Sequence, residues 1–232
     1  VGSEMCIRDS FSNDMLHVQK FYSDYVETYI ERDVSEMINV RDKFQFRRFM
    51  ELIASLTGEE LIYDNIAKII GIDKKTVMSW LSVLIAGDIV YLLEPYNEIS
   101  ISKRIIKRPK LYFTDTGLAC YLARLNSGEI LGASAFSGRF VETYIINEIK
   151  KSYVNNGIEP NFYYYRDSDM NEIDLVIIQD GKLHRIECKS GIKFNNNAVK
   201  GFKQLDKTNY QIGFKVITVS YTHLRAHETR GN

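Results

Sequence analysis

The sequence predicts an α/β protein, α+β overall, in which a helical half comes before a mixed helix-and-sheet half. Apolar residues recur at helical spacing from residue 21 to residue 87, and glycines end several of the repeats. Two strand-like runs, 89–93 and 110–113, follow these helices. Farther along, the runs 172–178 and 184–189 flank Asp180-Gly181, which is typical of a hairpin.

Both ends of the chain differ from the rest. Residues 1–10 and 219–232 resemble translated sequencing-adapter read-through, so we exclude them as artefacts, as one would a tag. His223 and His227, four residues apart, therefore carry no metal prediction. Residues 11–218 remain, a length that suits one large domain or two small ones.

Charge and composition narrow the class of protein. Thirty basic residues balance thirty acidic ones, so any surface that binds nucleic acid must be local. No apolar run approaches the 18 or so residues of a membrane span, and we find no secretory signal. Cys120 and Cys188 lack the spacing of metal ligands. We expect a protein of the reducing cytoplasm that makes no membrane contact.

The first half is predicted to form helices over residues 21–30, 44–56, 63–70 and 74–87. Between the last two, Gly71 makes a turn and Asp73 caps the following helix, which is the spacing of a helix-turn-helix. The strand-like runs 89–93 and 110–113 would supply a wing. Residues 37–115 are therefore predicted to be a winged-helix domain.

Basic residues cluster at two places on this predicted domain. One is the exposed start of the second helix of the pair; the other is the run 103–110, which leads into the second wing strand and has five basic residues and no acid. Clustered cations contact phosphates whatever the net charge. Winged helices also serve as adaptors between domains, so DNA binding and an adaptor role both stay open. The predicted DNA contacts are Lys74, Lys75, Lys103, Arg104, Lys107 and Arg108.

Four residues of the second half have the types and order used in metal-dependent phosphodiester cleavage. Asp174 lies on the first hairpin strand and Glu187 on the second, so two carboxylates meet at one sheet edge. Mg²⁺ takes one or two carboxylates plus water and phosphate oxygens, which makes Asp174 and Glu187 the predicted metal ligands. Lys189, on the same face as Glu187, would orient the attacking water or stabilise charge on the phosphate. Glu142, on a preceding helix, would complete the site through a bound water.

This order of elements resembles the PD-(D/E)XK nuclease superfamily, and within it the archaeal Holliday-junction resolvases. The similar stretch runs from about Ser137 to Thr218, and Ile173 stands where the superfamily often has proline. The resemblance implies a restriction-endonuclease-like α/β domain over residues 116–218 and Mg²⁺-dependent cleavage of DNA. The residues alone leave another interpretation open, a partly exposed charge cluster on a sheet edge with no metal.

A wider set of segments resembles the prokaryotic AAA-type ATP-binding proteins that carry domain of unknown function 4143. They are the winged helix and residues 29–34, 107–118, 138–142 and 164–174. In that family a P-loop ATPase domain comes first, but this chain contains no G-x-x-x-x-G-K-[ST] stretch. The resemblance thus implies that residues 11–36 are a remnant of the ATPase domain, that ATP binds only the full-length parent, and that the fragment does not hydrolyse ATP.

Two classes of function follow. The first is a Mg²⁺-dependent nuclease-like module that the winged helix delivers to DNA. The second is a non-catalytic DNA-binding or protein-binding module that regulates the ATPase. In either case the implied partners are DNA, the missing ATPase domain and further copies of the intact protein.

Overall fold

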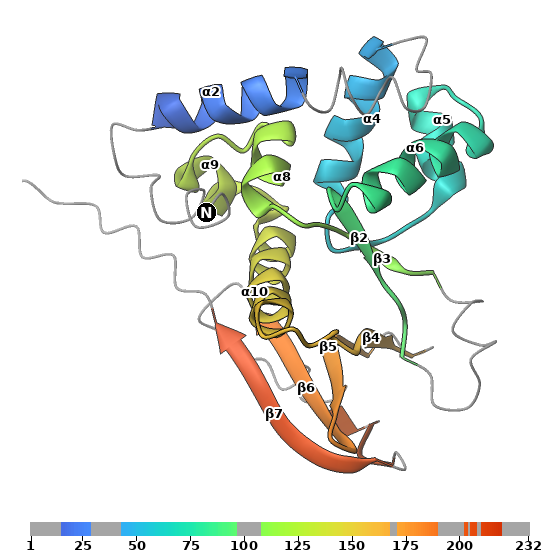
Figure 1. Ribbon diagram of the computed structural model, residues 1–232, viewed down its shortest axis with the longest axis vertical. Helices are drawn as coiled ribbons and strands as arrows, with labels where there is room; N and C mark the ends of the chain where they lie inside the picture. Colours follow the sequence, from blue (N-terminus) through green and yellow to red (C-terminus); the bar gives the residue numbers. More distant parts are fainter. Residues whose placement is uncertain are drawn as a thin grey trace, which may run out of the picture.

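The computed structural model describes residues 15–28, 43–96, 108–167, 171–189, 202–203, 205–207 and 210–219. They form a mixed structure with a three-stranded and a four-stranded sheet, which agrees with the predicted α/β class (Figure 1). No helix within these ranges combines the length and apolar character that crossing a bilayer requires.

Four helices build most of the first half. The predicted helix over residues 21–30 is displaced, since α2 ends at Tyr25 and a π-helical turn covers residues 26–28. Tyr22 of α2 and Val26 of the π-helical turn are buried, which agrees with the apolar face predicted from the sequence. The helix begins earlier than predicted, at Met15, and residues 29 and 30 of the predicted helix lie outside the described residues. The four helices are α2 (Met15–Tyr25), α4 (Lys43–Ser55), α5 (Tyr63–Ile70) and α6 (Lys74–Ala86).

The turn between α5 and α6 forms as its residues predict. Gly71 has a φ of +79°, a left-handed conformation that glycine adopts without the steric cost of a side chain, and its N–H donates to the carbonyl of Ala67. The Asp73 carboxylate accepts the Thr76 N–H at 2.9 Å and caps α6. Local chemistry therefore fixes both helix ends.

The three-stranded sheet is antiparallel and has the order β1-β3-β2. Its strands are β1 (Glu59–Glu60), β2 (Val90–Leu93) and β3 (Lys110–Phe113). The two predicted wing strands are thus present and paired. All four residues of β3, the central strand, are buried. Lys103, Arg104 and Lys107, predicted DNA contacts between β2 and β3, lie outside the described residues.

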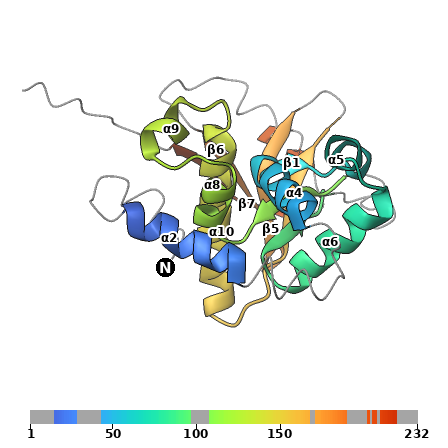
Figure 2. The same ribbon diagram turned by 90° about the horizontal axis from the view of Figure 1, so that it is seen from above.

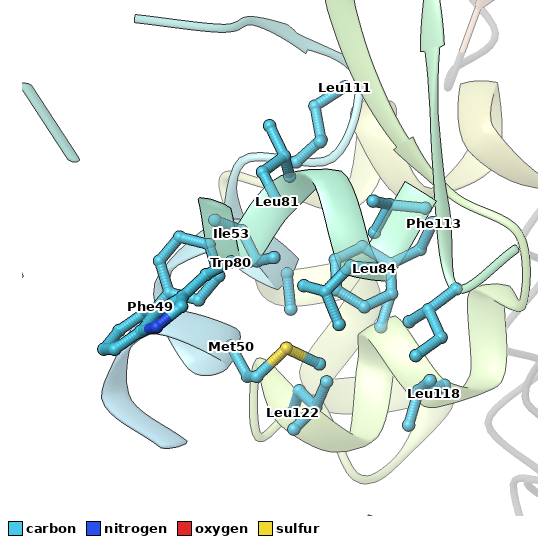
Figure 3. Packing of buried hydrophobic residues seen from close by; sticks show 14 of the residues in the cluster. Phe49, Met50, Ile53, Trp80, Leu81, Leu84, Leu111, Phe113, Leu118 and Leu122 are labelled. Atoms are coloured by element: carbon cyan, nitrogen blue, oxygen red, sulfur yellow. The ribbon is translucent and has the colours of Figure 1, made fainter. Parts of the chain in front are cut away.

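The first core is packed around α4. The ring of Trp80 meets Phe46 and Phe49 edge-on, with centroids 5.1 and 5.3 Å away (Figure 3). After β3, Asp115 caps α8 (Thr116–Leu122), whose Leu118 and Leu122 enter the same core. Figure 2 shows α2 lying beside α8, with α9 (Gly128–Ala133) next to them.

The second half is a sheet crossed by one long helix, α10 (Ser137–Asn155) (Figure 1). The predicted hairpin is present: β5 and β6 pair antiparallel, and Asp180 and Gly181 both take the positive φ that its tight turn requires. After the short η3 (Leu205–Lys207), the last strand pairs parallel to β6. The sheet has the order of its strands in sequence, β4 (Phe162–Arg166), β5 (Glu172–Gln179), β6 (Lys182–Lys189) and β7 (Gln211–Val219).

The two halves contact each other through β2, β3 and β4. Tyr164 of β4 exchanges backbone hydrogen bonds with the segment after β2, donating to the Glu94 carbonyl at 3.0 Å and accepting from the Tyr96 N–H at 2.6 Å. A second core cluster combines Leu93 and Tyr112 of the first sheet with α10 and the second sheet. Strand β3 therefore lies against the elements that carry the predicted site.

Truncation of Phe49 to Ala should lower the free energy of unfolding by about 3–5 kcal/mol, because its fully buried ring would leave a cavity beside Trp80. Urea unfolding measures the change. Ile69→Ala is the matched control, since Ile69 is 57% exposed and its loss should cost within about 0.5 kcal/mol. Equal losses in the two variants would contradict the packing described for α4.

Candidate functional site

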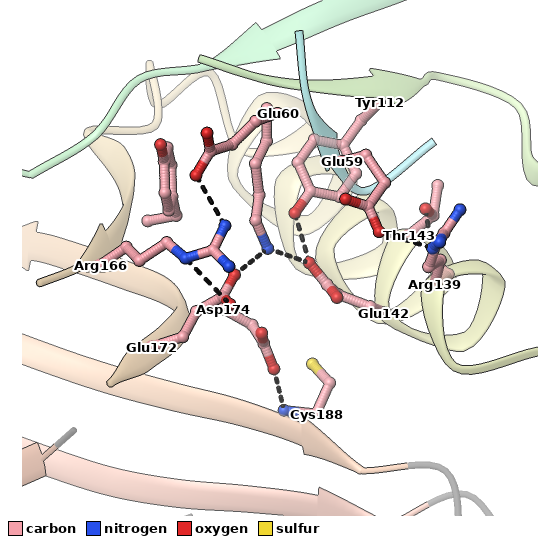
Figure 4. Close-up of polar contacts among 12 residues, drawn as sticks. Glu59, Glu60, Tyr112, Arg139, Glu142, Thr143, Arg166, Glu172, Asp174 and Cys188 are labelled. Atoms are coloured by element: carbon pink, nitrogen blue, oxygen red, sulfur yellow. Dashed lines mark hydrogen bonds and ion pairs between the residues drawn. The ribbon is translucent and has the colours of Figure 1, made fainter. Parts of the chain in front are cut away.

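The four predicted site residues lie where α10 meets the ends of β5 and β6. Figure 4 shows two of them, Glu142 of α10 and Asp174 of β5. Asp174 and Glu187 are each one position beyond the cross-strand pair Leu175–Ile186, so the two strands present them side by side. Glu142 faces Asp174 from α10, and it lies close enough that the charge of Asp174 raises the pKa of Glu142. The two predicted carboxylates therefore meet, but on the two inner strands of the sheet rather than at its edge.

Asp174 and Glu187 are both buried, with 7% and 4% of their surfaces exposed. One oxygen of Asp174 accepts the backbone N–H of Cys188 at 2.7 Å. One oxygen of Glu187 accepts from the Lys189 ammonium at 2.5 Å, as expected for residues two apart on one strand face. The other, Oε2, is buried and has no hydrogen-bond partner among the described residues.

Lys110 is a member of the site that the sequence interpretation missed. Its ammonium lies 3.0 Å from Glu142 Oε1 and 2.5 Å from Glu172 Oε1, and only 4% of the residue is exposed. Tyr112, two residues along β3, also donates to Glu142 Oε1. In Figure 4 Tyr112 meets Glu142 from the side opposite the second sheet. One signal in the sequence could have revealed this role. Side chains two positions apart on a strand point to the same face, so Lys110 had to lie on the same face of β3 as Tyr112.

Arg166 of β4 lies beside the site and pairs with glutamates of both sheets. Its guanidinium contacts Glu60 of β1 at 2.6 Å and Glu172 at 3.9 Å. Glu60 lies 106 residues from Arg166 in the sequence, so no local pattern indicates this pairing. A second ion pair thus joins the two sheets beside the Lys110 contacts.

Burial and crowding of like charges raise the pKa values of the site carboxyls. For Glu142, burial and then the charge of Asp174 raise the pKa to about 7, although Lys110 opposes the shift. For Asp174, burial and then the charge of Glu187 also raise the pKa to about 7. Burial raises the pKa of Glu187 as well. With pKa values of about 7, Glu142 and Asp174 change their charge near neutral pH, so small changes in their surroundings alter it.

Lys110 stays charged in this environment. Burial alone would lower the pKa of its ammonium, but Glu142 and Glu172 outweigh that effect and raise it above the ordinary value. The site therefore contains a permanent cation supplied by the first sheet.

The donor set fits a magnesium ion that keeps much of its water. Among the residues with described positions, no three His, Cys, Asp or Glu side chains are placed to share one ion. Mg²⁺ commonly takes only one or two carboxylates, however, and Asp174 and Glu187 are such a pair. The unpartnered, buried Oε2 of Glu187 is the atom that a cation would satisfy.

The described DNA-contact candidates lie on the surface. Lys74 pairs with Asp64 at 2.9 Å, and Lys75 and Arg108 are exposed. Lys74 and Lys75 begin α6, as predicted. The backbone carbonyl of Arg108 accepts from the Tyr164 hydroxyl at 2.5 Å, so Arg108 lies near the second sheet.

Two family models match the chain, and each of them contains some of the residues of the site. A family model described as Domain of unknown function (DUF8612) matches residues 9–129, more than half of the chain. The chain belongs to the DUF8612 family. A second model, Domain of unknown function (DUF4143), matches residues 137–231. The resemblance to domain 4143 is thus confirmed for the second half, and the match continues past residue 218.

In this DUF8612 chain, Lys110 and Tyr112 come from the first matched region and the site carboxylates from the second. Two similar proteins are uncharacterized proteins of Mycobacterium bovis and Mycobacterium tuberculosis; each is 24% identical over 165 residues, covering 71% of this chain. The chain spans 36% of the length of these relatives. No solved structure matches it significantly.

Raising the pH from 5 to 8 should destabilise the fold through Glu142 and Asp174. Their folded pKa values of about 7 exceed the values near 4 of an unfolded chain, so folding retains protons. The stability they contribute is complete below about pH 4 and is lost as the pH rises through about 7. Glu142→Gln should therefore flatten the pH dependence of the free energy of unfolding between pH 5 and pH 8, because one of the two groups that release a proton in this range is gone.

Urea unfolding at pH 5 and pH 8 measures this effect, with Glu148→Gln on the outer part of α10 as the control. Parallel pH profiles for wild type and Glu142→Gln would show that the Glu142 carboxyl does not take up a proton in the folded protein.

Proposed function

We propose that the chain is a winged-helix domain joined to a PD-(D/E)XK nuclease-like domain, and that the second domain hydrolyses phosphodiesters of DNA with Mg²⁺. The observation that carries the proposal is the pair of buried neighbouring carboxylates, Asp174 and Glu187, with one Glu187 oxygen that has no hydrogen-bond partner among the residues that the structure describes. The sequential order of α10, β4, β5, β6 and β7 supports it, because the resemblance implies that order of elements.

Each residue has a distinct part in this proposal. Asp174 and Glu187 would hold the ion, whose chemistry when bound is to polarise a phosphate oxygen and acidify a water molecule. The backbone N–H of Cys188 fixes the Asp174 carboxylate. Lys189 contacts Glu187, and its partly exposed ammonium can orient a water molecule or contact a phosphate. Glu142, held by Tyr112, faces Asp174 across the site.

The first domain would supply DNA contacts through Lys74, Lys75 and Arg108 and through the predicted contacts between β2 and β3. The support is local: the α5–turn–α6 unit and the wing strands occur together, with exposed cations at the start of α6. An ATPase parent would drive the two domains, and the greater length of the mycobacterial relatives leaves room for one.

A second function, a non-catalytic module that regulates the ATPase, has one specific observation in its favour. Lys110 already neutralises Glu142 and Glu172, so part of the negative charge of the site is balanced within the chain. In that case the cluster would hold the two domains together and no ion would enter.

Asp174→Asn should weaken Mn²⁺ binding at least about tenfold, because it removes one of the two charged ligands but keeps an acceptor for the Cys188 N–H. Titration calorimetry on the full chain measures the affinity, and Asp64→Asn on the surface is the control. Equal affinity in wild type and Asp174→Asn would place any metal elsewhere.

Lys189→Met should reduce Mg²⁺-dependent cleavage of branched or duplex DNA about a hundredfold. The methionine keeps the apolar stem and removes the ammonium. Unaltered cleavage would remove Lys189 from the chemistry, and a wild type that cuts no DNA with Mg²⁺ or Mn²⁺ would favour the non-catalytic module.

The double variant Lys75→Gln/Arg108→Gln should weaken DNA binding for all sequences and reduce the salt slope of binding by nearly one unit per lost phosphate contact. Fluorescence anisotropy at several salt concentrations measures both quantities. Lys151→Gln on α10 is the control, and an unchanged slope in the double variant would favour the adaptor role.

A further inference from the structure

We infer that Lys110 is a tethered cation that competes with the divalent ion, so that metal binding to the nuclease-like domain depends on the position of strand β3 in the first domain. The inference rests on the proposed function and adds its regulation. Lys110 lies in the region matched by the DUF8612 model, whereas the carboxylates that it affects lie in the region matched by the DUF4143 model.

The position of the ammonium carries the first step. It contacts one oxygen each of Glu142 and Glu172, from α10 and β5, at hydrogen-bond distance. Asp174, one of the two proposed metal ligands, is near enough for its charge to favour the protonated lysine. A divalent ion bound at Asp174 would therefore face a fixed positive charge in a buried, weakly screened site.

The second step is that Lys110 and Lys189 are placed differently. Lys189 is on β6, beside Glu187, and moves with the metal ligands. Lys110 belongs to β3, which is hydrogen-bonded to β1 and β2 of the other sheet. Only Lys110 can leave the carboxylates when the two sheets separate. Withdrawal of β3 would also remove the Tyr112 hydroxyl from Glu142. The carboxylates of Glu142 and Glu172 would then lose their contacts with β3.

The third step is that Lys110 cannot leave the site while β3 stays in place. A charged group left buried without its partner is strongly unfavourable, so the ammonium stays with Glu142 and Glu172. The ion pair of Arg166 with Glu60 lies at the same boundary and would have to break or follow if β3 withdrew. While the two sheets remain in contact, the charge of Lys110 therefore opposes an ion bound at the proposed metal ligands.

The test compares Mn²⁺ affinity of the full chain with that of Lys110→Met, by titration calorimetry. Methionine keeps most of the stem and removes the charge, so we expect about tenfold tighter binding. Lys151→Met on α10 is the matched control and should leave the affinity unchanged. Affinity that is equal or weaker in Lys110→Met would overturn the competition.

The double variant Lys110→Met/Glu172→Gln covers the case in which the single variant does not fold. It removes both members of one buried ion pair together, which proteins tolerate better than the loss of one. The proposed ligands Asp174 and Glu187 remain, so tighter Mn²⁺ binding than in Glu172→Gln is again expected, and equal binding again overturns the competition. If neither wild type nor any Lys110 variant binds Mn²⁺, the proposed metal site itself fails; if all bind equally, the metal site stands and only the role of Lys110 fails.

Discussion

The structure depends on one buried ion-pair group, the ammonium of Lys110 between Glu142 and Glu172. Taking these charges out of water is costly, and the mutual attraction offsets that cost only while the geometry is kept. The surrounding packing keeps it. Tyr112 stacks on Tyr91 and bonds to Glu142, while Tyr164 joins β4 to the chain after β2. The boundary between the two sheets is therefore held together by polar contacts as well as by packing.

The same burial gives the site its chemical character. In water, Glu142 and Asp174 would be ionised at neutral pH, but burial and mutual repulsion raise their pKa values to about 7. Such shifts weaken the fold where the carboxylates ionise, and they are common where a protein binds ions or substrates. A purely structural ion pair would not require Glu187 Oε2 to be buried with no partner among the described residues. The unpartnered atom is what separates this cluster from an ordinary salt bridge between domains.

Local patterns in the sequence predicted the parts of this site that lie on one hairpin. Strand alternation and the Asp180-Gly181 turn suffice to put Asp174 beside Glu187. The Asp73 cap was equally local. Contacts between distant segments were not predictable in this way. Lys110 meets Glu142 across 32 residues, and Arg166 meets Glu60 across 106, because the packing of two sheets places them. Strand β1 has two residues, too few to show any alternation.

Lys110 enters the site from a central strand rather than from a loop, and this decides what kind of motion could move it. All four residues of β3 are buried, and β1 and β2 bond to its two edges. A strand held in this way cannot shift by itself without breaking hydrogen bonds on both sides. Separation of Lys110 from Glu142 therefore requires the three-stranded sheet to move as a unit against α10 and the second sheet. A force applied to the three-stranded sheet would reach the carboxylates directly, whereas a local fluctuation of the chain near the site would not release them.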